Sequence, residues 1–434
     1  MNASYNLNQG QKAAAKMFME FLMNPGKELI ISGPAGVGKT YLMNHMIDQT
    51  MPRYHELCEL MGIDPDFTSV AMTATTNKAA EVLSRAVGRP TKTVHSFFNL
   101  VLKDDYKTGQ TVITKNRNWE IHKNLIIFVD EASMIDTELW KAIQEGTMNC
   151  KLVYVGDRHQ LAPVLEDLSP VYKHHSPLVE LLEPVRNAGQ PALMAICNQL
   201  RRTVETGVFE PIQQVPGVID QLDGQQMQDE IYQAFHAQTH DARILAFTNK
   251  RVVDYNAHIR AIRQLPDSYQ PGELLVNNTV YHHKTGHLSV EMGVTVKRNH
   301  GPSQITIDTK HDVKLDVERL DLEDDFGNII NNVPIPTNRA HFTDLMKYYR
   351  KCKNWSQYFQ LKNNIADLRP RDAATVHKSQ GSTYDTVFID LGNIGTCNAT
   401  SQVARMLYVA FSRAKHRVCL YGDLPAKYGG PVLP

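Results

Sequence analysis

The segment Gly33-Pro34-Ala35-Gly36-Val37-Gly38-Lys39-Thr40 constrains the fold of this chain more than any other, because it is a complete G-x-x-x-x-G-K-[ST] motif. It directly follows a short apolar segment and opens a helical pattern, which is the context in which this phosphate-binding loop (P-loop) occurs. Its glycines let backbone N–H groups surround phosphate oxygens, and the helix N-terminus adds a favourable dipole. We therefore predict a nucleotide site on an α/β sheet, with Lys39 on the β- and γ-phosphates and the Thr40 hydroxyl on Mg²⁺.

A pair of acidic residues predicts that the nucleotide is hydrolysed. The apolar segment Ile126–Val129 ends in Asp130 and Glu131, about ninety residues after the P-loop. We expect Asp130 to complete the Mg²⁺ site and Glu131 to polarise the attacking water. Two acids after a strand are common by themselves. In this order after a P-loop, they indicate an ATPase with ATP and Mg²⁺ as cofactors, and not a protein that only stores nucleotide.

Short apolar segments alternate with helical patterns along most of the chain. The expected strands are Leu29–Ser32, Ser69–Met72, Leu125–Val129, Leu152–Val155, Ile244–Phe247, Val387–Leu391 and Val418–Tyr421, and the expected helices are Lys39–Thr50, Asn77–Val87, Thr137–Glu145 and Ser401–Ala414. Such alternation predicts mostly parallel sheets that helices cover on both faces. A chain of 434 residues suits two or three domains, so we expect two α/β domains of the P-loop NTPase type. No internal repeat is evident.

Two segments interrupt the alternation, and we expect each to be an insertion. Residues 270–369 are rich in Val, Thr, Asn and Gly, with a hairpin expected near Lys284-Thr285-Gly286, which predicts a small β-rich domain. A second hairpin is expected at Leu100–Lys115, turning near Lys107-Thr108-Gly109. The predicted boundaries are 1–98 and 119–185 for the first α/β domain, 99–118 for its hairpin, 186–269 and 370–434 for the second α/β domain, and 270–369 for the β-rich insertion.

Composition limits the class of protein. Lys+Arg and Asp+Glu balance at 46 each, which argues weakly against nucleic-acid binding, although local charge along a groove decides affinity. No run approaches the roughly 18 apolar residues of a membrane span, and the N-terminus lacks signal-peptide features, so we expect a cytoplasmic protein without membrane contact. The six cysteines form no C-x-x-C pair and no histidine cluster has completing ligands, so we expect reduced thiols and no zinc site.

The segment Gly156–Val164 reads G-D-x-x-Q-L-x-P-V after an apolar strand, which places Gln160 where it can sense the γ-phosphate. This segment closely resembles motif III of superfamily 1 helicases, and the other motifs of that family occur in their proper order. They are Asn8–Lys12, Thr73–Ala80, Thr93–Phe97, Leu182–Asn187, Ala374–Thr383 and Leu407–Ala414. The T-x-H-S-F-F and H-K-S-Q-G versions resemble the RecD-like branch, superfamily 1B.

The resemblance implies a fold and a set of nucleotide contacts. Both α/β domains would be RecA-like, the hairpin would be a wedge that splits duplexes, and the β-rich insertion would be SH3-like. Gln11 would read adenine, and Gln380 and Gly381 would lie near the nucleotide. Arg186 and Arg413 would contact the γ-phosphate, where an arginine finger is worth about 10³–10⁵ in rate. A surface ion pair remains a fair alternative for Arg186.

The resemblance also predicts a surface that binds a DNA strand. Its residues are Thr75, Thr76, Asn77, His95, Ser96, Phe97 and Phe98 in the first α/β domain, and Thr248, Asn249, His377 and Lys378 in the second. Polar groups at loop ends hold phosphates, and aromatic rings stack on bases without reading sequence. For Phe97 and Phe98, core packing is nearly as good an account. Thr75 stands where the family usually has proline.

Together these patterns predict an ATP-driven helicase that moves 5′-to-3′ along single-stranded DNA and unwinds duplex DNA as a monomer. The expected partners are single-stranded DNA, the DNA fork and a single-strand-binding or replisome protein, in phage replication or recombination within the host cytoplasm. Two alternatives stay open: an ATP-dependent subunit of a nuclease or recombination complex, and a nucleotide-gated DNA clamp without unwinding. Glu131 together with Arg413 argues against the clamp, because a clamp does not need fast hydrolysis.

Overall fold

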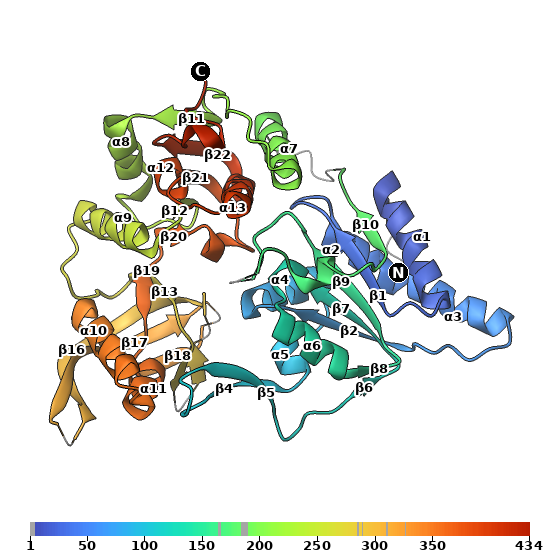
Figure 1. Cartoon of the computed structure of the whole chain (residues 1–434), viewed down its shortest axis with the longest axis horizontal. Helices are drawn as coiled ribbons and strands as arrows, with labels where there is room; N and C mark the ends of the chain where they lie inside the picture. The colour runs from blue at the N-terminus through green and yellow to red at the C-terminus, as the bar shows by residue number, and fades with distance from the viewer. Residues whose placement is uncertain are drawn as a thin grey trace. The chain divides into compact units, whose positions relative to one another are not determined.

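The computed structural model describes residues 5–163, 166–183, 190–283, 286–288, 290–309, 311–325 and 327–434. It divides into two compact units (Figure 1). Unit 1 consists of Met1–Val101, Ile113–Glu210 and Asn398–Lys415, and unit 2 of Leu102–Val112, Pro211–Cys397 and His416–Pro434. Two short segments, 102–112 and 398–415, therefore belong to a different unit from the residues on either side of them in sequence. The predicted domain boundaries stay a prediction, because compactness does not by itself define them.

Unit 1 is built on a six-stranded sheet in the order β10-β1-β9-β7-β2-β3, in which all neighbouring strands run parallel. The strands are β1 (Glu28–Ser32), β2 (Ser69–Ala74), β3 (Thr91–Thr93), β7 (Leu125–Asp130), β9 (Lys151–Gly156) and β10 (Leu178–Glu180), with a separate pair of β6 (His122–Lys123) and β8 (Thr147–Met148). The helices are α1 (Gln9–Met23), α2 (Lys39–His45), α3 (Met51–Leu60), α4 (Asn77–Val87), α5 (Val94–Phe97), α6 (Thr137–Glu145), α7 (Pro191–Thr206) and α13 (Thr400–Ser412). The strands and helices predicted in this part are confirmed, but the predicted helix 39–50 becomes a π-helical turn at Met46–Thr50 and continues without a break into α3.

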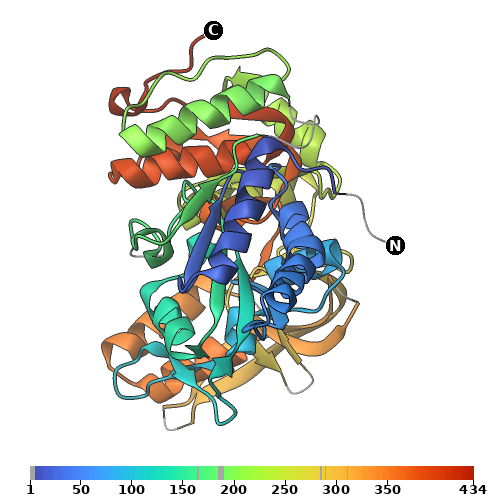
Figure 2. The ribbon, with the colours of Figure 1, turned by 90° about the vertical axis from the view of Figure 1, so that its right-hand side faces the viewer.

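Alternating strand residues fill a hydrophobic core on each face of this sheet. Leu29 and Ile31 of β1 join the core that α1 to α4 complete, whereas Ile30 joins the core that α5 and α6 complete. Helices α7 and α13, which are far apart in sequence, lie side by side (Figure 2). Unit 1 therefore contains the P-loop together with the helix that carries Arg413.

Unit 2 contains a five-stranded sheet in the order β11-β22-β21-β12-β20. Its strands are β11 (Ile219–Leu222), β12 (Ala242–Ala246), β20 (Ala373–Thr375), β21 (Tyr384–Asp390) and β22 (Ala414–Tyr421), and its helices are α8 (Gly224–Phe235), α9 (Asn249–Ile262) and α12 (Leu391–Ile394). The pairs β11–β22, β12–β20 and β12–β21 are parallel. Its core joins Ile231, Ile244 and Phe388 from a helix and two strands. The second predicted α/β region is thereby confirmed.

The chain passes through the strands of both sheets in the same order. In unit 1 the succession β1, β2, β3, β7, β9 gives the spatial order β1-β9-β7-β2-β3, and in unit 2 the succession β11, β12, β20, β21, β22 gives β11-β22-β21-β12-β20. Short sequence matches occupy equivalent strand ends: T-N-K at 76–78 and 248–250, T-V-H at 93–95 and 375–377, F-x-D at 128–130 and 388–390, and G-D at 156–157 and 422–423. The expectation of no internal repeat is wrong for the structure, because matches of two or three residues escape notice in the sequence.

The insertion in unit 2 is a β-rich module, as predicted. A five-stranded antiparallel sheet has the order β18-β17-β16-β13-β19, and a small pair, β14–β15, stands apart. The strands are β13 (Leu274–Asn277), β14 (Tyr281–His283), β15 (Gly286–Leu288), β16 (Gly293–Asp308), β17 (Val313–Asp324), β18 (Ile329–Pro336) and β19 (Leu368–Pro370). Two helices that the sequence did not predict, α10 (Arg339–Lys351) and α11 (Trp355–Asn364), follow β18. Lys284 and Thr285 of the predicted turn lie outside the described residues.

The second predicted hairpin consists of β4 (Leu100–Asp104) and β5 (Thr111–Lys115). Its tip, residues 102–112, belongs to unit 2, where it packs on α11. The Asp104 carboxylate accepts hydrogen bonds from Lys362 (3.2 Å) and Asn363 (2.8 Å), and the ring of Tyr106 lies 4.9 Å from that of Phe359. A polar clamp and an aromatic contact therefore fix the tip of this hairpin.

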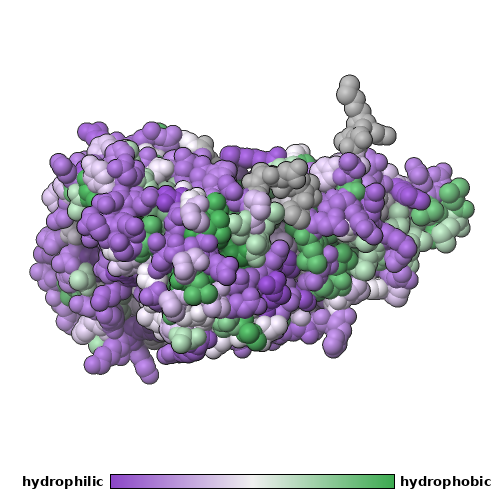
Figure 3. Space-filling view, turned by 90° about the horizontal axis from the view of Figure 1, so that it is seen from above, coloured by the Kyte–Doolittle hydropathy of each residue, from purple (hydrophilic) through white to green (hydrophobic). Residues whose placement is uncertain are grey.

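The face of the molecule seen in Figure 3 is mostly hydrophilic, with hydrophobic residues in scattered patches. Among the exposed apolar side chains are Leu60 and Met61 at the end of α3, with 83% and 60% of their surface accessible. In the described part of the chain, no helix combines the length and the apolar character that crossing a membrane requires.

Candidate functional site

The P-loop joins β1 to α2, and its conformation requires its glycines. Gly36 and Gly38 have positive φ angles of 85° and 77°, which side-chain-bearing residues rarely adopt. At Gly33 a Cβ atom would lie 2.5 Å from the carbonyl oxygen of Leu181, which leaves no room for a side chain. The loop can therefore turn tightly and expose backbone N–H groups to a phosphate.

Two side chains hold the P-loop from inside unit 1. The Lys39 ammonium donates hydrogen bonds to the carbonyl oxygens of Gly33 (2.7 Å) and Pro34 (2.9 Å). Gln11 is buried, donates from Nε2 to the Val37 carbonyl (3.1 Å) and accepts from the Asn8 N–H (3.2 Å). Gln11 thus contacts the loop directly, while its predicted adenine contact stays a prediction.

The acidic pair lies where β7 ends. Glu131 has a left-handed backbone (φ 54°, ψ 41°), an arrangement that costs a non-glycine residue about 1–3 kcal/mol and occurs preferentially at functional sites. Its N–H donates to the Asp130 carboxylate (2.9 Å). Burial and the charge of Glu131 raise the pKa of Asp130, while the charge of Lys39 lowers it.

These residues fit a divalent cation. The Asp130 carboxylate and the Thr40 hydroxyl are hard oxygen donors, which Mg²⁺ prefers. Burial destabilises the charge of Asp130, so a nearby cation would stabilise that carboxylate in its ionised form. The hydroxyl of Thr75 contacts the same turn, because it donates to the Glu131 carbonyl at 3.4 Å. Thr75, predicted to bind DNA, is therefore also linked to the predicted catalytic acid.

The loop after β9 contains Gln160, and it is almost wholly buried. Burial alone would raise the pKa of Asp157, but hydrogen bonds from His159 and Tyr408 and the charge of Lys39 hold it well below its usual range. The Gln160 side chain is 6% exposed, and its Oε1 atom has no hydrogen-bond partner among the described residues. A buried amide oxygen in this condition is unusual and favours a functional role for Gln160.

The structure describes one of the two arginines predicted to contact the γ-phosphate. Arg413 follows α13 in unit 1, is 3% exposed, and donates from Nε to the Val409 carbonyl and the Ser412 hydroxyl, both at 3.2 Å. Arg186 lies outside the described residues. The role of each on the γ-phosphate stays a prediction.

The predicted strand contacts of unit 1 gather at the carboxyl ends of β2 and β3. The Thr76 hydroxyl caps α4 by accepting the Ala79 N–H (3.1 Å), which leaves Asn77 as the first residue of the helix. Burial lowers the pKa of His95, so this imidazole is neutral near pH 7. Ser96 is exposed on the short helix α5.

The two phenylalanines differ. Phe98 is 0% exposed within the unit 1 core, so its predicted stacking on a base is wrong and the core-packing alternative holds. Its ring leaves so little space that a Cβ at Gly146 would lie 2.6 Å from it. Phe97 is half-buried and stacks on His122 with ring centroids 4.3 Å apart.

Unit 2 presents the equivalent residues at the ends of β12 and β20. Thr248 caps α9 through the Arg251 N–H (3.3 Å), as Thr76 caps α4. Burial lowers the pKa of His377, as it does for His95. Lys378 forms an ion pair with Glu291 at 3.1 Å.

The remaining predicted residues of unit 2 lie nearby in the chain. Asn249 opens α9 and accepts a hydrogen bond from Arg369 at 3.5 Å. Gln380 and Gly381 follow the short turn at 377–379, where Gly381 has a φ of 71°. Their predicted nucleotide contacts stay a prediction.

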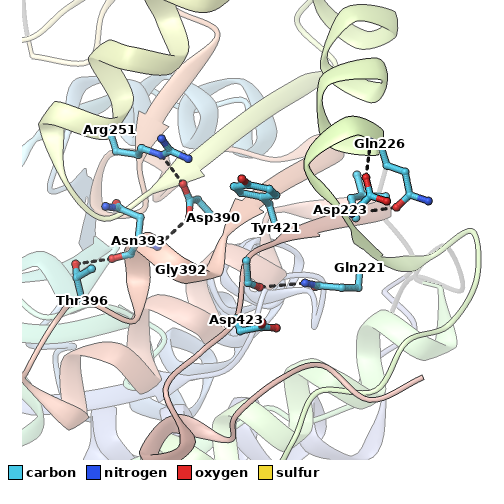
Figure 4. A pocket seen from close by; sticks show the side chains of 12 residues that line it. Gln221, Asp223, Gln226, Arg251, Asp390, Gly392, Asn393, Thr396, Tyr421 and Asp423 are labelled. Atoms are coloured by element: carbon cyan, nitrogen blue, oxygen red, sulfur yellow. Dashed lines mark hydrogen bonds and ion pairs between the residues drawn. The ribbon is translucent and has the colours of Figure 1, made fainter.

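A cavity of about 790 Å³ opens at the carboxyl ends of β11, β21 and β22, the position that corresponds to the P-loop region of unit 1 (Figure 4). Arg251 and Asn393 surround Asp390 on one side of this cavity, while Asp223 and Gln226 lie on the other. Asp223 accepts the Gln226 N–H (2.8 Å) and Gln226 accepts the Asp223 N–H (3.0 Å), so this capping box occupies the start of α8. Sequence reasoning missed this cluster, although F-I-D at 388–390 repeats the F-V-D pattern at 128–130.

Two protein families match parts of the chain. Residues 6–214 match an AAA domain, and residues 372–421 match a UvrD-like helicase C-terminal domain. The ATP-dependent DNA helicase dda of Enterobacteria phage T4 is 22% identical over 463 residues, which cover 95% of this chain and 98% of that protein. The ATP-dependent DNA helicase PIF1 of Emericella nidulans is 29% identical over 166 residues, which cover 35% of this chain and 20% of that protein.

Solved structures of Pif1 helicases have a similar fold. One describes DNA unwinding at forked double-stranded DNA by two coordinating Pif1 helicases, and another is Bacteroides Pif1 with ADP-AlF3 and single-stranded DNA. Both cover 99% of this chain and 95% of the matched chain at 14% identity, with TM-scores of 0.52 and 0.51. The predicted fold class, α/β with two RecA-like regions, is confirmed.

Proposed function

We propose a function for this chain on the basis that it is a superfamily 1B helicase related to Dda and Pif1. It is an ATP-dependent DNA helicase, and we propose in addition that it requires Mg²⁺ and moves 5′-to-3′ along single-stranded DNA as a monomer. The proposed role is unwinding in phage replication or recombination, alongside a single-strand-binding or replisome protein. The cytoplasm stays the predicted compartment.

One observation carries the proposal: Lys39, Asp130 and Gln160 lie at or after the carboxyl ends of three adjacent strands of a single sheet. The strands are β1, β7 and β9, and parallel strands bring their carboxyl ends to one edge. The charge of Lys39 reaches both Asp130 and Asp157, since it lowers the pKa of each. A triphosphate bound by the P-loop would therefore meet a cation, a metal-binding carboxylate and a buried amide.

Each residue at this edge would have a separate role in hydrolysis. Thr40 and Asp130 would hold Mg²⁺, which neutralises the charge that develops on the phosphates. Glu131 would orient the attacking water, and its left-handed turn fixes its direction relative to Asp130. Gln160 would hydrogen-bond the γ-phosphate or that water. Arg413 would stabilise the charge that spreads over the transferred group.

Two equivalent sets of residues, one in each unit, support the proposed movement along a strand. The set Thr76, Asn77, His95 follows β2 and β3, and the set Thr248, Asn249, His377 follows β12 and β20. Both threonines cap a helix, and both histidines are half-buried with a lowered pKa, so they are neutral near pH 7. Each set would contact phosphates of a DNA strand without reading its bases.

The hairpin β4–β5 is the proposed wedge. A wedge must resist the force of strand separation, and the contacts of Asp104 and Tyr106 with α11 stiffen its tip. The β-rich module, predicted to be SH3-like, would then hold the DNA strand beside this hairpin.

Strand release from two partial duplexes tests the proposal, one with a 5′ single-stranded tail and one with a 3′ tail, with and without Mg-ATP. Release from the 5′-tailed substrate alone is expected. Release from the 3′-tailed substrate alone would overturn the direction and keep the helicase. ATP turnover without release from either substrate would favour a translocase or gated clamp.

A further inference from the structure

Helix α13 contributes two side chains to the loop that carries Gln160, within unit 1. One Nη atom of Arg405 donates to the carbonyl oxygens of Arg158 (2.6 Å) and Gln160 (2.7 Å). The Tyr408 hydroxyl donates to the Asp157 carboxylate at 2.5 Å. Arg405 and Tyr408 are one helical turn apart, so they reach the loop from the same face of α13.

The loop is held from a second side by α7. The Asp157 carboxylate also accepts the His159 backbone N–H (3.0 Å), and His159 Nε2 lies 2.7 Å from the Glu205 carboxylate of α7. Asp157 and His159 are 0% and 1% exposed. The backbone from Asp157 to Gln160 therefore has little freedom, while the side-chain oxygen of Gln160 is left without a partner in the described chain.

Arg405 is poorly explained as a stabilising residue. Its side chain is half-buried, and desolvation lowers the pKa of its guanidinium although the charge of Asp157 raises it. Its Nε atom has no hydrogen-bond partner among the described residues. A half-buried cation whose Nε donor is unsatisfied is a costly way to hold a loop, which favours a role in function.

We propose that Arg405 and Tyr408 are positioning residues for ATP hydrolysis, because they fix the backbone of Asp157–Gln160 so that the Gln160 amide faces the γ-phosphate. This inference rests on the proposed function and goes beyond it. Arg413 lies on the same helix, two turns after Arg405. Displacement of α13 would therefore move Gln160 and Arg413 together, so the two phosphate contacts would form and break as one.

Steady-state ATP turnover with saturating oligo-thymidylate tests this inference in four full-length variants: Arg405→Gln, Arg405→Lys, Tyr408→Phe and Arg202→Gln. Arg202, on α7, is 61% exposed and serves as the matched control. Arg405→Gln should lower kcat by about 10- to 100-fold, since small misplacement of a catalytic group costs this much. The affinity for a fluorescent ATP analogue and the Tm should stay near wild type. Arg405→Lys should recover part of kcat, and Arg202→Gln should match wild type.

Tyr408→Phe keeps the volume of the ring and removes only the hydroxyl, so it decides the question if Arg405→Gln does not fold. A lower kcat at unchanged nucleotide affinity supports the inference. Wild-type kcat in both variants overturns it, as does parallel loss of kcat, nucleotide affinity and Tm, which would mark a structural role. Wild-type protein without DNA-stimulated turnover would instead overturn the proposed function and this inference with it.

Discussion

The carboxyl edges of the two RecA-like sheets have the same strand order but different chemistry. In unit 1 the first strand leads into the P-loop, where the positive φ angles of Gly36 and Gly38 allow backbone N–H groups to turn towards a phosphate. In unit 2 the first strand leads into Asp223, whose carboxylate accepts the Gln226 N–H and places a negative charge at the start of α8. That negative charge would repel a phosphate at this helix start. The repeated fold therefore does not determine the activity, which a few residues at one edge supply.

The strand-end aspartates show the same contrast. Asp390 accepts hydrogen bonds from Arg251 (2.6 Å) and Tyr255 (2.7 Å), so its charge is neutralised within unit 2. Asp130, its counterpart, accepts only the Glu131 N–H among the described residues. The carboxylate of Asp130 could thus contact the proposed Mg²⁺, whereas that of Asp390 is bonded to side chains of its own unit.

Replacement of Lys39 by alanine should have the largest effect and would sharpen this comparison. Loss of the ammonium would remove the charge proposed to bind the developing phosphate oxygens, so ATP turnover should fall by about 10³-fold. Gln225→Ala, at the exposed start of α8, is the matched change in unit 2 and should leave turnover unchanged. Turnover is measured as phosphate release with single-stranded DNA. Comparable losses of turnover in both variants would contradict the assignment of hydrolysis to the sheet edge of unit 1 alone.

Glu131→Gln should separate binding from hydrolysis. The amide keeps the shape but cannot accept a proton from water, so turnover should fall by about 10²- to 10⁴-fold at nearly unchanged ATP affinity. Leu391 follows Asp390 at the equivalent position, and Leu391 is buried. Single-turnover phosphate release checks the prediction, and turnover within a fewfold of wild type would exclude Glu131 as the catalytic base.

Much of this contrast could be predicted from sequence, because it depends on short local patterns. The P-loop, Asp130 and Glu131 follow apolar segments directly, and helix 77–87 was predicted with its bounds. For Phe98 the sequence left core packing and base stacking open, and it could not predict the bond from Tyr408 to Asp157, since both contacts join segments far apart in the chain. No local signal distinguishes such contacts before the fold is known.

Asp157→Asn and Asp423→Asn compare two G-D turns that occupy equivalent strand ends. Asp157 is buried and hydrogen-bonded, so the neutral amide should cost about 2 kcal/mol of stability. Asp423 is exposed, so its replacement should change stability by less than about 0.5 kcal/mol. Thermal unfolding at pH 7 measures both.

The same pair predicts a pH dependence. The folded-state pKa of Asp157 is lowered, so its stabilising contribution is complete above the ordinary carboxyl pKa near 4 and is lost as the pH falls towards its lower folded value. The difference in Tm between wild type and Asp157→Asn should therefore shrink on acidification below about pH 4. A difference that stays constant to pH 3 would indicate a cause other than charge.

The smallest expected effects would test whether the two proposed sets of DNA-contacting residues, one in each unit, are equivalent. His95 and His377 are neutral near pH 7, so each would donate a hydrogen bond to a phosphate without replacing a counterion. His95→Asn and His377→Asn should therefore weaken single-strand binding by a similar factor and leave the slope of log K against log salt unchanged. Lys378→Ala should reduce the magnitude of that slope by about 0.7, because a lysine that contacts phosphate releases a counterion. Lys378 must leave Glu291 to do so, which keeps its net contribution to affinity small. Unequal losses for the two histidines, measured by fluorescence anisotropy over a range of salt, would show that the repeated T-V-H segments have diverged in function as the sheet edges have.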